Sequence, residues 1–279
     1  MSKSVILRSL VYLATGLTFF SLIGIVLYVL IGGIPYLSPE LFSWNYNSEN
    51  VSLMPSLVNT FLTVILSLVI SVPIGILAAV FLIEYADLGV AAKSKIVRCF
   101  VSVIRIAADT LAGIPSIVYG LFGMLIFVTF FHWGYSLLAG GLTMAIMTLP
   151  VIQRTTEEAL ISVPMNYREG AFALGAGKLR TVTHVVLPTA IPGILSGVIL
   201  AIGRVVGETA ALIFTAGTVA QIPTSVFDSS RTLSVHMYNL SVEGLHTHEA
   251  MATGVVLLIV VVIINWLSEL VANKIRPVK

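Results

Sequence analysis

Six apolar stretches recur along the chain, and each is about as long as a membrane-crossing helix, which takes about 20 apolar residues. They cover residues 10–34, 57–83, 104–131, 135–152, 189–218 and 251–271, and Gly113 and Pro115 interrupt the third. Composition agrees, because 57% of the 279 residues are hydrophobic and only 10% are charged, a balance that no soluble domain of this size tolerates. The sequence predicts an all-α integral membrane protein with six transmembrane helices.

Lys and Arg are distributed unevenly between the segments that join these stretches. Of the fifteen, thirteen lie on one side: before the first stretch, between the second and third, between the fourth and fifth, after the sixth or, for Arg105, at the edge of the third stretch. Arg204 lies inside a stretch, and Arg231 is alone on the opposite side. Because short cytoplasmic segments are enriched in Lys and Arg, both termini and the loop 164–188 are predicted to be cytoplasmic.

The loop 164–188 is polar and punctuated by glycine, and its pattern predicts two short helices. Asn166 is placed to cap a helix over 167–174, with Glu169 three residues later in the capping-box position. Gly175 then supplies a left-handed break. A second helix is expected over 178–187, and Pro188 would start a new element.

This loop resembles the Glu-Ala-Ala…Gly…Ile-x-Leu-Pro loop of ABC importer permeases. The matching positions are Glu169, Gly170, Ala171, Gly175, Val185, Leu187 and Pro188. Gly170 and Val185 depart from the family's Ala and Ile, while the spacing is kept. The resemblance implies a type I importer permease whose loop, through Glu169, Gly170, Ala171, Gly175, Leu187 and Pro188, docks into a separate ATPase. ATP and Mg would be bound there, so this chain would be a non-catalytic subunit without a cofactor.

Arg204 and Glu208 are two ionisable residues inside the fifth stretch. Such residues cost about 2.5–3.5 kcal/mol on insertion scales and usually face a bundle interior or water. If the stretch is one helix, their i, i+4 spacing places them on one face. They could form a structural ion pair, or Arg204 could serve an anion's path, because its planar donor fork fits oxyanions. Two Gly-x-x-x-Gly pairs, Gly193/Gly197 and Gly203/Gly207, predict close packing of this helix.

Two segments sharpen the resemblance. Residues 203–210 are similar to the Gly-Arg-x-x-Gly-Glu-Thr-Ala segment of phosphate importer permeases, and residues 112–123 to their Ala-Gly-x-Pro-Ser-Ile-Val-x-Gly-Leu-Phe-Gly segment. The similarity covers about 57–275, and the subunit it resembles most is the PstA type. It implies phosphate as the substrate, with Arg204 and Glu208 in its path. It also implies four partners besides lipid: a similar PstC-type permease, two PstB-type ATPase subunits and an external PstS-type phosphate-binding protein. Nucleic acid is not expected to bind.

The chain would then divide at residue 56. Residues 1–56 would form an additional transmembrane helix with an external loop, and 57–279 the permease core in the cytoplasmic membrane of a prokaryote. Asp109, near the expected cytoplasmic end of the third stretch, is a second candidate for the substrate path. It could instead be an interfacial carboxylate that pairs with Arg105, one turn back.

Several alternatives stay open. The chain could be an importer for sulfate, molybdate or another oxyanion, a PstC-type subunit, a signalling subunit, or an ion-coupled carrier that uses Arg204 and Glu208 as a proton relay. The run from Gly175 to Lys178 is not a P-loop, because Phe172 and Leu179 stand where Gly and Ser or Thr are needed. His246, His248 and Glu249 are expected to be a solvated group and not a metal site.

Overall fold

The computed structural model describes residues 2–87 and 95–275, and the regular elements within them are all helical. Lys93, Arg276 and Lys279, which supported the predicted orientation, lie outside this part of the chain. The elements in order are α1 (Ser2–Gly33), the short 3-10 helices η1 (Ile34–Tyr36) and η2 (Pro39–Phe42), α2 (Met54–Val80), η3 (Phe81–Asp87), α3 (Lys95–Gly113), α4 (Ser116–Gly123), η5 (Met124–Phe130), α5 (Leu137–Ile161), α6 (Met165–Ala173), α7 (Lys178–Thr181), η6 (Val182–Val186), α8 (Leu187–Gly207), α9 (Ala210–Thr215), α10 (Leu233–Glu243) and α11 (Thr247–Ile275). Of these, η3, η5 and η6 are π-helical.

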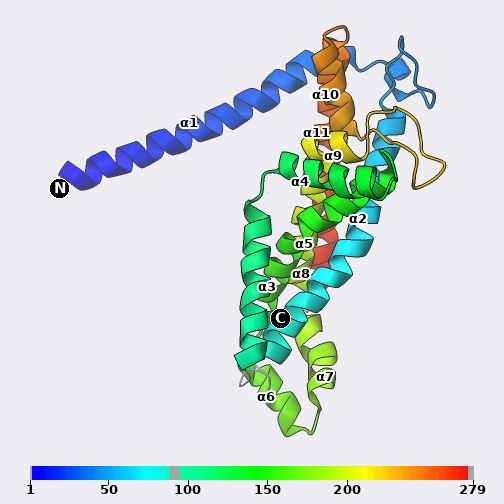
Figure 1. The fold of residues 1–279 in the computed structure, drawn as a ribbon. Helices are drawn as coiled ribbons and strands as arrows, with labels where there is room; N and C mark the ends of the chain where they lie inside the picture. The colour runs from blue at the N-terminus through cyan, green and yellow to red at the C-terminus, as the bar shows by residue number, and fades with distance from the viewer. Residues whose placement is uncertain (1, 88–94, 276–279) are drawn as a thin grey trace.

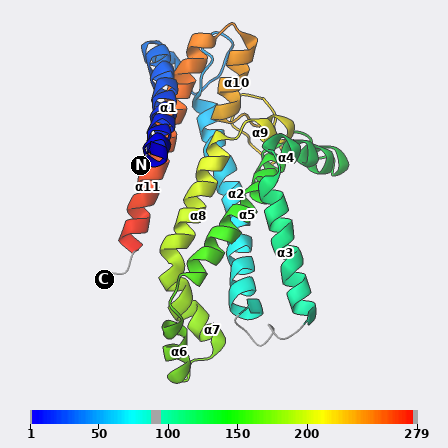
Figure 2. The same ribbon diagram turned by 90° about the vertical axis from the view of Figure 1, so that its left-hand side faces the viewer.

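Figures 1 and 2 show an elongated bundle in which α2, α3, α5, α8 and α11 run roughly along one axis. We call the end that carries α6 and α7 the loop end, and the opposite end the α10 end. α1 projects away from the bundle and reaches it at the α10 end (Figure 1). There, a Cβ on Gly33 would lie 2.6 Å from Val255 of α11. Elsewhere α1 is exposed, because only 6% of its span is buried.

α2 and α5 form the centre of the bundle and pack closely through small residues. A Cβ added to Gly75 of α2 would lie 2.9 Å from Ile152 of α5, and one added to Gly141 of α5 would lie 2.7 Å from Cγ of Leu66. Buried serine and threonine hydroxyls along α2 donate to carbonyls one turn back, as Thr63 does to Asn59. Such contacts let two backbones approach closely while most of these hydroxyls stay paired; those of Ser56 and Ser71 have no partner among the described residues.

α8 packs on α5 through one of its two predicted glycine pairs. A Cβ on Gly193 would lie 2.6 Å from Ala159, and one on Gly197 would clash with Thr155. This confirms the expected packing there. The prediction is wrong for the second pair, because a Cβ on Gly203 or Gly207 would meet open space within the described structure.

The third apolar stretch is not a straight helix. α3 begins at Lys95 and not at 104, and its axis lies at 106° to the helix that follows over Ser116–Phe130. Pro115 explains the bend, because it adopts an extended conformation (φ −61°, ψ 143°) and proline has no N–H to donate. Figure 2 shows α3 running along the bundle and α4 turning across it. Within residues 2–87 and 95–275, five helices are long and apolar enough to cross a membrane, or six if the bent pair is one span.

The fifth stretch is also broken, which overturns its prediction as one helix over 189–218. α8 ends at Gly207, Glu208 is extended (φ −74°, ψ 130°), and α9 begins at Ala210. At its other end, α8 continues α7 and η6, so that Lys178–Gly207 forms one 30-residue span. The second loop helix therefore merges into the membrane helix, although α8 itself does begin at Leu187, beside Pro188.

Candidate functional site

The loop 164–188 contains the two predicted helical segments, but the first begins differently. α6 starts at Met165 after an extended Pro164, and no side chain caps it. Asn166 lies inside the helix, so the predicted N-cap and the capping box with Glu169 are wrong. The fixed φ of Pro164, −57°, suits the residue that precedes a first helical turn. Gly175 has φ +81°, which confirms the left-handed break between α6 and α7.

Several large apolar side chains are exposed on the outer surface of this loop. Leu174 is 91% exposed, and Tyr167, Phe172 and Leu179 are also exposed. Tyr167 and Leu174 line a hollow of about 590 Å³, together with residues that include Gly170, Ala171 and Gly175. Large apolar side chains exposed together mark an interaction surface. Of the other residues predicted in the docking set, Glu169 and Pro188 are exposed, while Leu187 packs toward the core.

A buried carboxylate ties this loop to α2. Glu84, in η3 at the end of α2, is fully buried, and its Oε1 accepts from Arg168 Nε at 2.9 Å and Nη2 at 2.6 Å. Its Oε2 accepts from Lys178 Nζ at 2.8 Å. Arg168 belongs to α6 and Lys178 starts α7, so one side chain holds both segments of the loop. Sequence reasoning missed Glu84, because its partners lie 84 and 94 positions later.

Arg168 also fastens the end of α5. Its Nη1 donates to Val163 O at 2.7 Å, and its Nη2 donates to Leu160 O at 2.9 Å. These carbonyls lie in the last turn of α5 and just beyond it, where the helix supplies few N–H donors of its own; Leu160 O also accepts from the Val163 N–H at 3.3 Å. The guanidinium therefore joins α2, α5 and α6 at one point.

Arg204 and Glu208 do not form a structural ion pair, which was one of the two alternatives that the sequence left open. Glu208 lies beyond the end of α8, and its Oε1 accepts from the Ala211 N–H at 3.1 Å, which caps α9. Its carbonyl accepts from Ser234 Oγ at 2.6 Å. Among the described residues, the ion pairs do not include Arg204 with Glu208. The shared helical face expected from their i, i+4 spacing is absent, because the helix ends at Gly207 and Glu208 is extended.

Arg204 is half-buried on the last turn of α8, where the two segments that carried the resemblance meet. A Cβ on Gly120 of α4 would lie 2.7 Å from Ala211 Cα of α9. The Arg204 charge also lies within electrostatic reach of the Tyr119 hydroxyl, which donates to Leu111 O at 2.7 Å. The structure thus packs the segment 112–123 against Ala210 and Ala211, just beyond the turn of α8 that carries Arg204.

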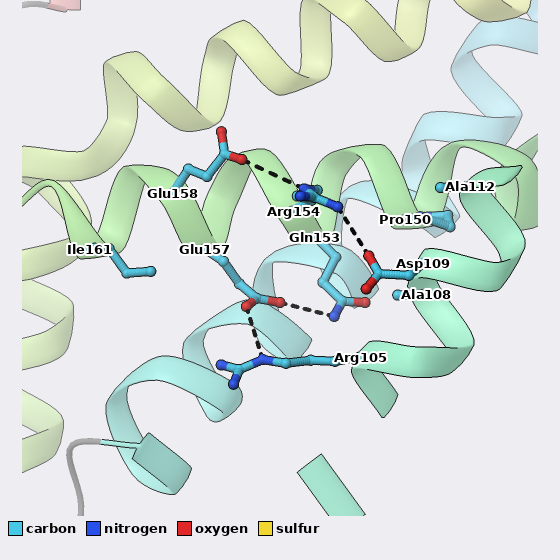
Figure 3. Close-up of a pocket in the computed structure, with 10 residues that line it drawn as sticks. All are labelled: Arg105, Ala108, Asp109, Ala112, Pro150, Gln153, Arg154, Glu157, Glu158 and Ile161. Atoms are coloured by element: carbon cyan, nitrogen blue, oxygen red, sulfur yellow. Dashed lines mark hydrogen bonds and ion pairs between the residues drawn. The ribbon is translucent and has the colours of Figure 1, made fainter. Parts of the chain in front are cut away.

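Asp109 lies in a groove of about 260 Å³ between α3 and α5 (Figure 3). Its Oδ1 accepts from Arg154 Nη1 at 3.0 Å, and Arg154 Nε lies 3.6 Å from Glu158. Arg105, the expected partner, instead lies 3.5 Å from Glu157. That expectation is wrong because both ion pairs cross between the two helices: Arg105 of α3 reaches Glu157 of α5, and Arg154 of α5 reaches Asp109 of α3. Asp109 is also near the far end of α3 and not near its start, since α3 begins at Lys95.

A second buried arginine lies at the α10 end. Arg231 is 4% exposed, and its guanidinium carbon lies 4.8 Å from the centre of the Tyr46 ring. Its Nε and Nη2 have no hydrogen-bond partner among the described residues. His236, in α10, contacts Val51 O through Nε2 at 3.1 Å. Burial, followed by the Arg231 charge, lowers the pKa of His236 to about 3.

The histidines of the 219–250 segment do not gather into a metal site in the described part of the chain. His246 Nδ1 lies 3.7 Å from Glu249 Oε2, and His248 stacks on Tyr36 with ring centroids 4.1 Å apart. His248 therefore helps to close the contact between α1 and α11.

Comparisons with known proteins identify the family. Residues 72–277 match the model of the binding-protein-dependent transport system inner membrane component. The chain is 35% identical over 275 residues to the probable ABC transporter permease protein YqgI of Bacillus subtilis (strain 168), covering 91% of this chain and 90% of the relative. It is 33% identical over 259 residues to the phosphate transport system permease protein PstA 2 of Mycobacterium bovis, covering 87% and 82%. It is 31% identical over 271 residues to the PstC permease of Mesorhizobium japonicum, covering 87% and 79%.

The fold agrees with a solved importer. A chain in the crystal structure of a bacterial alginate ABC transporter, in complex with its periplasmic protein, matches with a TM-score of 0.68 at 13% identity. The match covers 95% of this chain and 93% of that one. ABC permeases of this family are non-catalytic and work with a separate ATPase and a binding protein, which sets aside the ion-coupled carrier. The chain belongs to the binding-protein-dependent transport system inner membrane components, as a multi-pass permease subunit with the type I ABC importer fold.

Proposed function

We propose that this permease subunit imports inorganic phosphate and is of the PstA type. The observation that carries the proposal is the position of Arg204. It is a partly buried guanidinium inside a span, and it is not ion-paired with any described carboxylate. A permanent charge in a span needs water or an anion as a neighbour, and the guanidinium fork fits phosphate oxygens. The similarity to PstA 2 supports phosphate as that anion.

Asp109 and Glu208 take different roles in this proposal. Asp109 and Arg154 would form part of a polar, water-lined wall on the loop side of the path, because exposed ion pairs between α3 and α5 cannot face lipid. Glu208 would hold the α8–α9 break in place and so position Arg204. The remaining partners are the PstC-type permease, the PstB-type ATPase pair and the PstS-type binding protein.

The loop end is proposed to be cytoplasmic and to dock the ATPase through its exposed apolar surface. Single cysteines at Asn47 and Asn166, in a Cys99→Ser background, test this orientation with an impermeant thiol reagent added to intact cells. We expect position 47 to be labelled from outside and position 166 only after lysis. The reverse pattern would contradict the orientation.

The decisive experiment for the substrate removes the Arg204 charge. Purified complex with its ATPase and binding protein is placed in proteoliposomes, and ATP-dependent uptake of labelled phosphate is measured. Arg204→Gln should assemble normally and lose uptake by about 10²-fold, which corresponds to about 2.7 kcal/mol. Arg98→Gln, which removes an exposed charge at the start of α3, is the matched control and should transport normally.

The same vesicles separate phosphate from other oxyanions. An excess of sulfate or molybdate should leave uptake of labelled phosphate unchanged. If either competes fully and is itself imported, the substrate assignment is wrong, and the chain serves a different oxyanion. Full phosphate uptake by Arg204→Gln would remove Arg204 from the path.

A further inference from the structure

The attachment of the loop 164–188 to α2 is the least expected polar feature of the fold. α5 and α8 are joined to the loop through the chain itself, whereas α2 is not. Apolar side chains of α2, such as Ala79 and Val80, share a cluster with Val182 and Val186 of the loop. Apolar contact is non-directional, so this cluster alone allows the loop to slide or turn against α2.

Glu84 removes that freedom. Both of its oxygens are engaged, one by the Arg168 fork and the other by Lys178. A carboxylate held by a guanidinium through two N–H groups is directional as well as strong. The carboxylate sits in the π-helical η3, a type of irregularity that often marks functional positions in a helix.

The two halves of this link differ in exposure. The Arg168 side chain is 3% exposed and is also bonded to the end of α5, whereas the Lys178 side chain is 28% exposed. Lys178 Nζ also lies 5.8 Å from the Phe172 ring centroid, on the exposed apolar surface of the loop. A partner seated on that surface would therefore press directly on the Lys178 side of the link.

We propose that Glu84 is the positioning residue through which displacement of the loop by the ATPase is passed to α2. It acts through Arg168 and Lys178, and α2 in turn carries α5 through their close packing at Gly75 and Gly141. The inference rests on the proposed docking of an ATPase at this loop, but it does not depend on which anion is imported. A purely structural role would require only that the buried charges neutralise each other.

The test compares charge removal on one side and on both sides of the link. Glu84→Gln leaves Arg168 without a counter-charge, whereas the double variant Glu84→Gln with Arg168→Gln removes both fully buried charges and leaves only the partly exposed Lys178 charged. Complexes with the ATPase and the loaded binding protein are reconstituted in proteoliposomes. The ATPase that copurifies, the rate of ATP hydrolysis and the anion imported per ATP are measured. Glu243→Gln, which alters an exposed glutamate at the last residue of α10, is the matched control.

We expect the double variant to copurify with the ATPase and hydrolyse ATP, while anion imported per ATP falls about tenfold, within the range by which residues along a coupling route act. Wild-type import per ATP in the double variant would overturn the proposal and leave neutralisation as the role of Glu84. If the double variant does not assemble, Lys178→Gln decides, since it keeps the buried Glu84–Arg168 pair. It should lower import per ATP, and Lys178→Arg should restore it.

Unchanged import per ATP in Lys178→Gln would overturn the proposal. The wild-type complex separates this inference from the proposed function. If the ATPase does not copurify with wild-type permease, the docking assignment fails. If it copurifies but phosphate does not drive hydrolysis, the substrate assignment fails, and the Glu84 comparison is made with the anion that does.

Discussion

Arg168 and Arg231 are both almost fully buried, 2% and 4% exposed, at opposite ends of the bundle. All three nitrogens of Arg168 donate hydrogen bonds, and a carboxylate neutralises its charge. Arg231 has an aromatic ring on one face and two nitrogens without a described partner. The difference shows that burial of a charge does not by itself reveal its role. At the loop end the charge is fixed by three elements, while at the α10 end it is held in place mainly by packing.

Removing the hydrogen bonds of Arg168 at the loop end should have the largest effect on stability. Arg168→Met keeps the volume but leaves Glu84 with Lys178 alone and three acceptors without their donor. Loss of one partner from a buried pair costs about 3–5 kcal/mol, so the variant should yield little assembled complex. The amount of complex and its thermal midpoint in detergent measure this. A midpoint equal to that of the wild type would mean that the loop end is no more tightly fixed than the α10 end.

Lowering the pH should destabilise the α10 end, through protonation of His236. The pKa of His236 is lowered to about 3 by burial and by the nearby positive charge of Arg231, against about 6.5 in the unfolded chain. The unfolded state therefore binds a proton first, and the stabilisation present above pH 6.5 is lost as the pH falls toward 3. Between pH 6.5 and 5 the loss should be about 2 kcal/mol, seen as a lower thermal midpoint. His236→Asn should abolish this slope, while His248→Asn should keep it.

The left-handed turn at the loop end offers a local test. Gly175 has φ +81° and no atom within 4 Å of an added Cβ, so Gly175→Val strains only the backbone, by about 1–2 kcal/mol. We expect weaker ATPase binding at unchanged permease yield. Gly177→Val is the matched control, because Gly177 is extended at φ −72° with equally open surroundings. Equal effects at both positions would show that added bulk, and not strain, is responsible.

Removing the charge of Arg231 should have the smallest effect on stability. Arg231→Met gives up the contact with Tyr46, worth about 0.5–2 kcal/mol, but it also removes a buried charge without a described acidic partner. The two changes oppose each other, and the net shift in stability should stay within about 1 kcal/mol. The variant should also flatten the acid slope of His236. A loss as large as that of Arg168→Met would show that Arg231 has a strong partner in the assembled protein.

Much of the fold could be predicted from sequence because hydropathy is local. Apolar stretches gave the spans, and Pro115 and Gly175 correctly marked a bend and a left-handed turn. The broken fifth stretch was missed, because Gly207 was interpreted as a packing residue and not as a helix end. The expectation that Arg204 and Glu208 share one helical face depended on that unbroken helix.

The site was harder to predict, because its contacts join distant positions. Asp109 has a suitable arginine one turn away, yet its partner is Arg154, 45 positions later. Glu84 resembles an ordinary charge at the end of a span, and only the folded loop buries it. The roles of Arg204, Glu208 and Asp109 in transport, and of the loop residues in docking, stay predictions.

The exposed α1 has a consequence for how the protein is made. With 6% of its span buried and its close contacts with α11 confined to Val29, Gly32 and Gly33 in its last turns, α1 depends on lipid more than on the bundle for its stability. It is synthesised long before α11, so it can insert by hydropathy alone and wait as an independent anchor. Joining α1 to α11 at the α10 end would then be one of the last steps of biogenesis, after the bundle around α2 and α5 has assembled.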